Sequence, residues 1–151
     1  MTKRKKIIIL LVSVVIVINL VPYLINTYRY ADFVKAVPMD KKWEGHVKSE
    51  KGYVYLVQKP PYFSFEGYLS INKHVVKTND QFSLIIWPLV LGGYEYGFRV
   101  QKDGESHEIY IDKNMKPTNE NEDIEGSKQV VEQNKKELEL LFKKANGMFS
   151  L

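Results

Sequence analysis

Cysteine is absent from all 151 residues of this chain. Without thiols no disulfide framework can form, so a domain that works outside the cytoplasm must be held together by its own apolar core. Thiolate nucleophiles and thiolate metal ligands are excluded for the same reason. A lipid-modified bacterial lipoprotein is excluded as well, because that modification needs a cysteine at the cleavage site.

Recognisable catalytic patterns are also missing. The chain contains no GxSxG, HExxH, P-loop or GxGxxG pattern, and the spacings of His46, His74 and His107 match no metal-binding motif. The acidic segment 118–125 lacks the Asp-x-Asp-x-Asp-Gly order of an EF-hand loop, although carboxylates of this kind suit a hard cation. We therefore expect no catalytic residue, no cofactor and no metal site, and we expect that the protein is not an enzyme.

An excess of charge of one sign is missing beyond the first few residues. The net charge of +4 is accounted for by the basic cluster at residues 3–6, and residues 26–151 carry equal numbers of basic and acidic side chains. Nucleic-acid binding therefore loses its main electrostatic support. Basic residues predominate in 26–77 and acidic residues in 78–126. Either these two segments attract each other on folding, or the acidic segment faces a basic partner or a cation.

A long apolar run follows directly behind the basic cluster. Residues 7–25 read IIILLVSVVIVINLVPYLI, with Ser13 and Asn19 as the polar positions. As an α-helix the run measures about 28 Å, close to the hydrocarbon thickness of about 30 Å in a bilayer. The charges before it predict a cytoplasmic N-terminus. We therefore predict a cytoplasmic tail at residues 1–6, one transmembrane signal-anchor from Ile7 to Ile25, and an extracytoplasmic remainder.

A cleaved signal peptide shows the same order of basic and apolar segments. Its apolar core usually spans about 7–15 residues, which is shorter than residues 7–25. The best small-residue cleavage pattern, Val34-Lys35-Ala36, lies well past the run. Tyr23 and Tyr28 fall where aromatic rings prefer the headgroup layer. An uncleaved anchor in the cell membrane is favoured, secretion after cleavage is the alternative, and a buried helix of a soluble fold is a third interpretation.

Alternating apolar and polar residues predict an antiparallel sheet beyond the anchor. We interpret residues 26–42 as a juxtamembrane linker, helical to about Ala36, and residues 43–151 as one extracytoplasmic α+β domain with about five or six strands. The clearest alternation, at 62–71, places Phe63, Phe65, Leu69 and Ile71 inward. The candidate strands comprise residues 43–48, 53–58, 62–71, 82–91, 94–100 and 107–111, with one more short strand at 74–78.

The segment Phe82 to Leu91, FSLIIWPLVL, is the most hydrophobic part of the predicted domain. It is too short to cross a bilayer. We interpret it as a buried strand in which Pro88 marks a bulge or the strand end, followed by a tight turn at Gly92-Gly93. The alternative is a segment that dips into the membrane surface or binds a hydrophobic partner.

The C-terminal residues show helical periodicity. Ser127 is the expected N-cap, and Asn146-Gly147 is the expected C-terminal stop. One apolar stripe along this helix is predicted to pack on the sheet. It comprises Val130, Val131, Leu138, Leu141, Phe142 and Ala145.

Residues 96–117, YGFRVQKDGESHEIYIDKNMKP, comprise a strand, an Asp-Gly turn and a strand ending in Asp. This pattern resembles the closing hairpin of PepSY-type exported domains. In that family a helix precedes the hairpin, whereas FSLIIWPLVL stands there in this chain. The resemblance implies a role in regulating peptidases outside the membrane.

We predict from these features a membrane-anchored, non-catalytic module that binds or regulates a protein or peptide at the cell envelope. A bacterial origin is expected from the small, lysine-rich chain and from the lack of N-x-S/T sites after the anchor. The expected contact surface combines the hydrophobic segment, the tyrosines that follow it and the acidic loop. Its residues are Trp87, Tyr94, Tyr96, Glu120, Glu122 and Asp123.

Two alternative functions remain open. The chain is a structural subunit of a membrane complex if Ser13 and Asn19 contact neighbouring helices within the bilayer. Less favoured is a cell-envelope hydrolase whose site is assembled from scattered residues, with His107, Asp112 and Glu66 as the first candidates.

Overall fold

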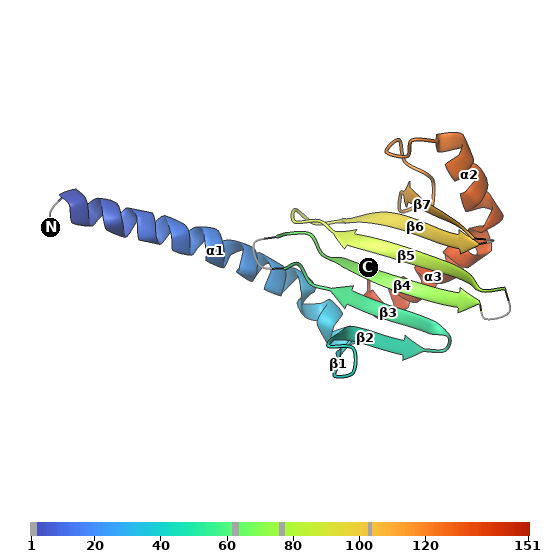
Figure 1. The fold of residues 1–151 in the computed structure, drawn as a ribbon, viewed down its shortest axis with the longest axis horizontal. Helices are drawn as coiled ribbons and strands as arrows, with labels where there is room; N and C mark the ends of the chain where they lie inside the picture. The colour runs from blue at the N-terminus through green and yellow to red at the C-terminus, as the bar shows by residue number, and fades with distance from the viewer. Residues whose placement is uncertain (1–2, 62–63, 76–77, 103) are drawn as a thin grey trace.

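The computed structural model describes residues 3–61, 64–75, 78–102 and 104–151 (Figure 1). The fold is α+β, as predicted, with one long apolar N-terminal helix, a seven-stranded antiparallel sheet and two C-terminal helices. The elements are α1 (Lys3–Ala36), β1 (Met39–Asp40), β2 (Gly45–Glu50), β3 (Tyr53–Gln58), β4 (Tyr68–Val75), β5 (Asp80–Pro88), β6 (Tyr94–Lys102), β7 (Glu105–Ile111), α2 (Ile124–Gln133) and α3 (Lys135–Phe149).

Helix α1 runs without interruption through Pro22 and extends far beyond the sheet (Figure 1). It is long and apolar enough to cross a membrane, and its apolar segment is wholly outside the domain core. Length and composition of this kind fit a membrane anchor or a signal sequence. The C-terminal turns of α1 differ from the rest, because Tyr30, Phe33 and the following Val37 are buried in the core. The segment interpreted as a linker therefore supplies part of the domain's packing.

The sheet is a meander in which each strand pairs with the next, in the order β1 to β7. It has seven strands where about five or six were expected, and the two-residue β1, which pairs with β2, was not predicted. Strand β5 ends at Pro88, and positive φ angles of 95° at Gly92 and 87° at Gly93 form the turn into β6. Proline has no N–H to donate to a ladder, which explains the strand end.

The expected strand over 62–71 is wrong in its first half. Strand β4 begins only at Tyr68 and continues to Val75, so it absorbs the start of the short strand predicted at 74–78. Phe65 is exposed and does not face inward, and Phe63 lies outside the described residues. The neighbouring strand β3 ends at Gln58, before Lys59-Pro60-Pro61, so residues 64–67 have no partner for a ladder.

The single predicted C-terminal helix is divided in two at Asn134. Ser127 is not the cap, since the Asp123 side chain accepts the Gly126 N–H at 2.9 Å and starts α2. Asn134 is the C-cap of α2 and the N-cap of α3. Helix α3 does not stop at Asn146-Gly147 as predicted but continues to Phe149. Gly147 lowers the stability of a helix, and burial of the Phe149 side chain offsets that loss.

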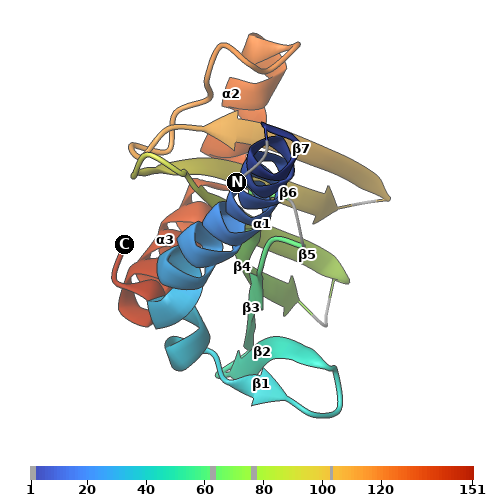
Figure 2. The ribbon, with the colours of Figure 1, turned by 90° about the vertical axis from the view of Figure 1, so that its left-hand side faces the viewer.

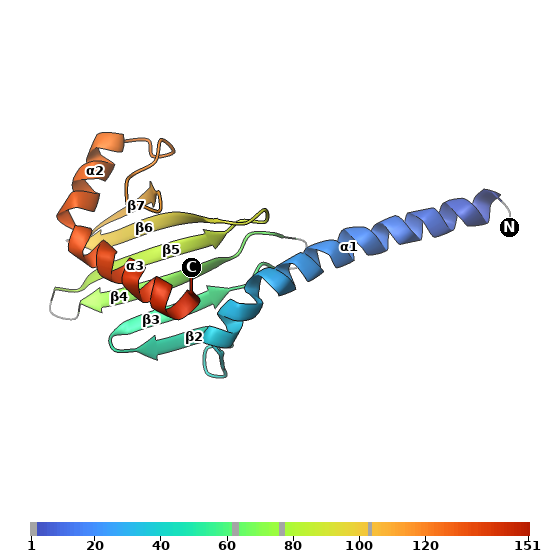
Figure 3. The same ribbon diagram turned by 180° about the vertical axis from the view of Figure 1, so that it is seen from behind.

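Helices α3 and the end of α1 lie on one side of the sheet (Figures 2 and 3). Phe149 of α3 joins them, with its ring 5.8 Å from that of Phe33 in an edge-on arrangement. The apolar stripe of α3 packs against the alternate residues of the central strands, as the periodicity predicted. The fully covered residues of this layer include Leu69, Ile71, Leu84, Ile86, Phe98, Leu138, Leu141 and Ala145.

Candidate binding surface

The other face of the sheet carries no helix in the described part of the chain (Figure 2). We call it the open face. Its side chains line up across the strands in rows set by the register. In the central row, Ser70 pairs with Ile85, Ile85 with Gly97, and Gly97 with Tyr110. Small residues in this row leave a depression in the middle of an uncovered surface.

The Trp87 indole lies across this depression. A Cβ placed on Gly97 would come within 2.7 Å and 2.9 Å of two atoms of the ring. Only glycine therefore allows the indole to lie this close to the strand. The ring centroid is 5.8 Å from that of Tyr110, at an interplanar angle of 31°. The pair forms an aromatic platform, and Ile85 beneath it is only 6% exposed although no helix covers it.

An ion pair borders the platform on the side away from α1. Arg99 and Glu108 stand opposite each other on β6 and β7. The guanidinium donates from Nε at 2.9 Å and from Nη2 at 2.6 Å to the same carboxylate oxygen. Both groups remain partly exposed, so they offer a cation and an anion to a ligand beside an apolar surface.

These features enclose a shallow pocket of about 320 Å³ that spans five adjacent strands, β3 to β7. Its composition is mixed, with aromatic, aliphatic, hydroxyl, amide and charged groups. Side chains of this variety are typical of protein-recognition surfaces, in which Trp, Tyr and Arg supply most of the binding energy. The lining residues are Leu56, Tyr68, Ser70, Asn72, Ser83, Ile85, Trp87, Arg99 and Glu108.

The edges of the sheet are less accessible than the open face. The chain after β7 folds back along it, with a bridge between Ile111 and Pro117. Asn121 accepts the Tyr110 N–H at 2.8 Å and donates to the Tyr110 carbonyl at 2.8 Å. At the opposite edge, β1 has only two residues. Addition of a partner strand to either edge is therefore restricted.

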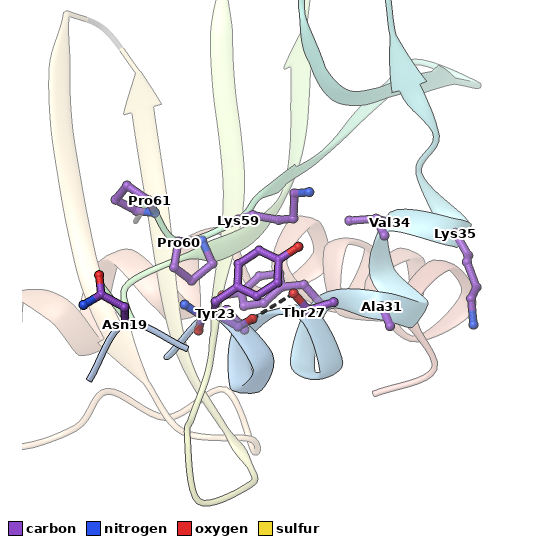
Figure 4. Close-up of a pocket in the computed structure, with 11 residues that line it drawn as sticks. Asn19, Tyr23, Thr27, Ala31, Val34, Lys35, Lys59, Pro60 and Pro61 are labelled. Carbon is purple, nitrogen blue, oxygen red and sulfur yellow. Dashed lines mark hydrogen bonds between the residues drawn. The ribbon is translucent and has the colours of Figure 1, made fainter. Parts of the chain in front are cut away.

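A second groove, of about 490 Å³, follows α1 (Figure 4). Residues from Asn19 to Lys35 form one wall, and Lys59-Pro60-Pro61 form the other. One end lies on the apolar run and the other beyond it. The hydroxyl of Thr27 is occupied within the helix, where it donates to the Tyr23 carbonyl at 2.8 Å.

The structure separates the residues that the sequence grouped as a contact surface. Trp87 is on the open face, whereas Tyr94 and Tyr96 are on the helix-covered face. The Tyr96 ring packs 5.2 Å from that of Phe142 on α3, and burial together with the nearby Tyr94 raises the pKa of its hydroxyl. The two tyrosines therefore belong to the packing between sheet and helix.

The acidic residues Glu120, Glu122 and Asp123 line a different groove between β7 and α2. This groove adjoins the open face, because Tyr110 lines it and also stacks on Trp87. The Asp123 carboxylate is already engaged as the cap of α2. The acidic loop and Trp87 thus lie on two neighbouring surfaces that meet at β7.

The three residues considered for a hydrolase lie at different places in the fold, with His107 in β7, Asp112 just after it and Glu66 before β4. His107 lines the acidic groove without Asp112 or Glu66. Burial alone would raise the pKa of Asp112, but hydrogen bonds at 2.8 Å from the backbone N–H groups of Lys116 and Asn114 hold that pKa below its usual value. This carboxylate therefore stabilises the turn after β7.

No metal-binding cluster of three or more His, Cys, Asp or Glu residues is present among the described residues.

No protein-family model matches the chain, and searches of curated proteins and of solved structures found no similar protein. The resemblance of residues 96–117 to the PepSY hairpin therefore gains no support from these comparisons.

Sequence reasoning identified Trp87 but missed the partners that hold it. The sequence does contain a signal for these partners, in the turn between the two strands that carry them. Asp103-Gly104 predicts a two-residue hairpin, and counting outward from that turn places Arg99 opposite Glu108 and Gly97 opposite Tyr110, as the register has them. A glycine inside a strand, facing away from the core, also indicates close approach of another group.

Proposed function

We propose that this protein is a single-pass membrane protein whose sheet domain lies outside the membrane and binds a segment of a protein partner on the open face. The apolar helix α1 behind a basic cluster supports the anchor and its orientation. The domain is a non-catalytic binding module in this proposal, and a cell-envelope protein is its target.

The observation that carries the proposal is the Trp87 platform on an uncovered sheet. The end of a large indole lies close against Gly97, next to Tyr110 and the Arg99–Glu108 pair. Exposed sheet faces are ordinarily polar, and burial of the rest of the core does not require an aromatic platform there. Trp, Tyr and Arg are the residues most enriched at binding hot spots.

The dimensions of the pocket suit an extended segment. Five strands about 4.8 Å apart measure roughly 19 Å across, and an extended chain advances about 3.3 Å per residue. About six residues of a partner therefore fit across the open face. The Arg99–Glu108 pair would give such a segment one site for an acidic side chain and one for a basic side chain.

The test is site-specific photocrosslinking of the full-length protein in its native membranes. A photoreactive residue at Ser83 lies in the open-face pocket, and one at Lys136 lies on the exposed side of α3 as the control. We expect a discrete crosslinked protein from position 83 and not from position 136. Equal products from both positions, or none from position 83, would reject the open face as the binding surface.

Alanine variants then test the platform itself. Trp87→Ala should weaken capture by roughly 30-fold or more, the loss of about 2 kcal/mol that defines a hot spot. Trp43→Ala is the matched control, because Trp43 is exposed in the turn before β2. Unchanged capture by a folded Trp87→Ala protein would contradict the proposal.

Replacing residues 7–25 with an unrelated apolar helix tests the alternative of a structural subunit. Capture should be preserved in this variant, whereas a loss of capture would favour a subunit that assembles through α1.

A further inference from the structure

The loop between β5 and β6 carries three consecutive exposed aliphatic residues. Leu89 is 37% exposed, Val90 44% and Leu91 100%. We call residues 89–91 the apolar tip. It contains no charged or polar side chain. Water is a poor solvent for such a cluster, so its exposure indicates contact with something apolar.

The apolar tip lies beside α1 at the level where the apolar run ends. It forms a groove with Leu24, Ile25 and Tyr28 of the helix. The hairpin that carries it points toward the N-terminal part of α1, away from the bulk of the sheet (Figures 1 and 3). Residues 24 and 25 are the last apolar positions of the run. The tip is thus level with the outer end of the segment that would fill the hydrocarbon.

Hydrogen bonds fasten this end of the sheet to the helix. The Arg29 guanidinium donates from Nη2 to the Pro88 carbonyl at 2.6 Å and to the Phe65 carbonyl at 3.1 Å. Asn26 donates to the Ser64 carbonyl at 2.7 Å. These contacts set the height of the hairpin along α1, so the position of α1 in a bilayer would also fix the position of the tip.

Two hairpin turns at opposite ends of the sheet differ in chemistry. The turn between β2 and β3, at the far end, contains Lys51 and Gly52, and Lys51 pairs with Glu50. At the near end the corresponding hairpin carries only the aliphatic tip. An apolar turn at the end beside the apolar helix, and a charged turn at the opposite end, is the arrangement that a lipid surface on one side favours.

We propose that the apolar tip inserts into the outer leaflet beside α1, at the boundary between headgroups and acyl chains. This inference rests on the proposed anchoring of α1. It adds a second point of contact with the lipid, and two contacts fix the tilt of the sheet and the direction in which the open face points. With a single helix alone, the helix and the domain fixed to it would be free to tilt and to turn together in the bilayer.

The experiment uses the lack of natural cysteines. Single variants Val90→Cys, Ile16→Cys and Lys51→Cys of the full-length protein are labelled with one environment-sensitive dye and reconstituted in vesicles of phosphatidylcholine and phosphatidylglycerol. Brominated lipids quench dyes in the bilayer, and aqueous iodide quenches dyes in water. We expect the dyes at 16 and 90 to be quenched by bromolipid, and the dye at 51 to be quenched by iodide.

The outcomes separate the tip from the anchor. If the dye at 90 behaves like the dye at 51 while the dye at 16 stays in lipid, the tip is aqueous and the inference is wrong, but the anchor is upheld. If both 16 and 90 are aqueous, the anchoring itself fails. Protection of the dye at 90 from both quenchers would indicate protein contact and would also overturn the inference.

A charge variant removes the effect of the dye's own apolarity. Adding Leu89→Glu and Leu91→Glu to Val90→Cys should move the dye at 90 into water, with a loss of bromolipid quenching and a gain of iodide quenching. The dye at 16 should not change. Retained bromolipid quenching at 90 in this charged tip would show that the dye inserts by itself, and the insertion of the natural tip would then be rejected.

Discussion

The two faces of the sheet are made from the same strands but differ in what fills them. On the covered face, residues such as Leu69, Leu84 and Phe98 are completely buried under α3 and α1. On the open face, the small and polar residues Ser70 and Asn72 lie around a single indole. The covered face therefore supplies the core of the fold, and the open face is left without a helix over it in the described part of the chain.

The open face is nevertheless not an ordinary solvated surface. A sheet with one face in water usually alternates apolar and polar residues cleanly. Here Ile85 points outward and is shielded by its neighbours rather than by a helix. Ile85 is thus covered by side chains of the sheet itself, with the Trp87 indole close by.

The largest expected effect is on the covered face. Leu84→Ala removes a fully buried side chain beneath α3 and should lower the free energy of unfolding by about 2–5 kcal/mol, because a cavity remains. Val54→Ala, on the open face of β3, should cost less than about 1 kcal/mol. Chemical denaturation of the full chain in mild detergent measures both. Similar losses of unfolding free energy in the two variants would show that the open face contributes as much to stability as the covered face.

A smaller effect is expected where the indole meets Gly97. The added methyl of Gly97→Ala collides with the end of the Trp87 ring, so the ring must swing away at a cost of about 1–2 kcal/mol. Trp87 fluorescence should change, best read in a Trp43→Phe background. Combining the change with Trp87→Ala should remove most of the penalty. Gly147→Ala in α3 meets no neighbouring atoms and should be neutral or stabilising.

The smallest effect is expected from the Arg99–Glu108 pair. Both side chains are about half exposed, so a double-mutant cycle with alanine should give a coupling below about 1 kcal/mol that decreases with salt. Lys73 of β4 and Glu137 of α3 form an ion pair on the covered side and are less exposed. Their coupling should be larger and less sensitive to salt. The reverse order would mean that the open-face pair is structural.

Local patterns predicted most of the elements. Alternation predicted the two strands of the β6–β7 hairpin, because side-chain direction in a strand depends only on the backbone. The hydrophobic run predicted a buried strand at β5, and the strand end at Pro88 was one of the two outcomes expected for that proline. Capping was predicted less well. Asp123 replaced Ser127, and Asn134 divided the helix, since several residues near each boundary can form caps and tertiary packing selects among them.

The candidate site was less predictable than the elements. Trp87 was identified from its hydrophobic segment, but Tyr94 and Tyr96 were assigned to the same surface although they face the opposite side. Neighbours in sequence are not neighbours on a face. The residues that hold the indole come from β6 and β7, and they are found only through the register of the sheet.

The long apolar helix, the antiparallel strands and the helical C-terminal region could all be predicted from the chain alone, because they depend on the composition and spacing of nearby residues. Which face of the sheet is covered, and which loop lies beside α1, became clear only from the packing of the elements. Those outcomes depend on where α3 packs, some fifty residues after β5 in the chain, and on the hydrogen bonds of Arg29 to the carbonyls of Phe65 and Pro88, which are distant in sequence. Contacts between segments far apart in sequence leave no periodic signal, since each side chain's partner is selected by the packing of the whole domain.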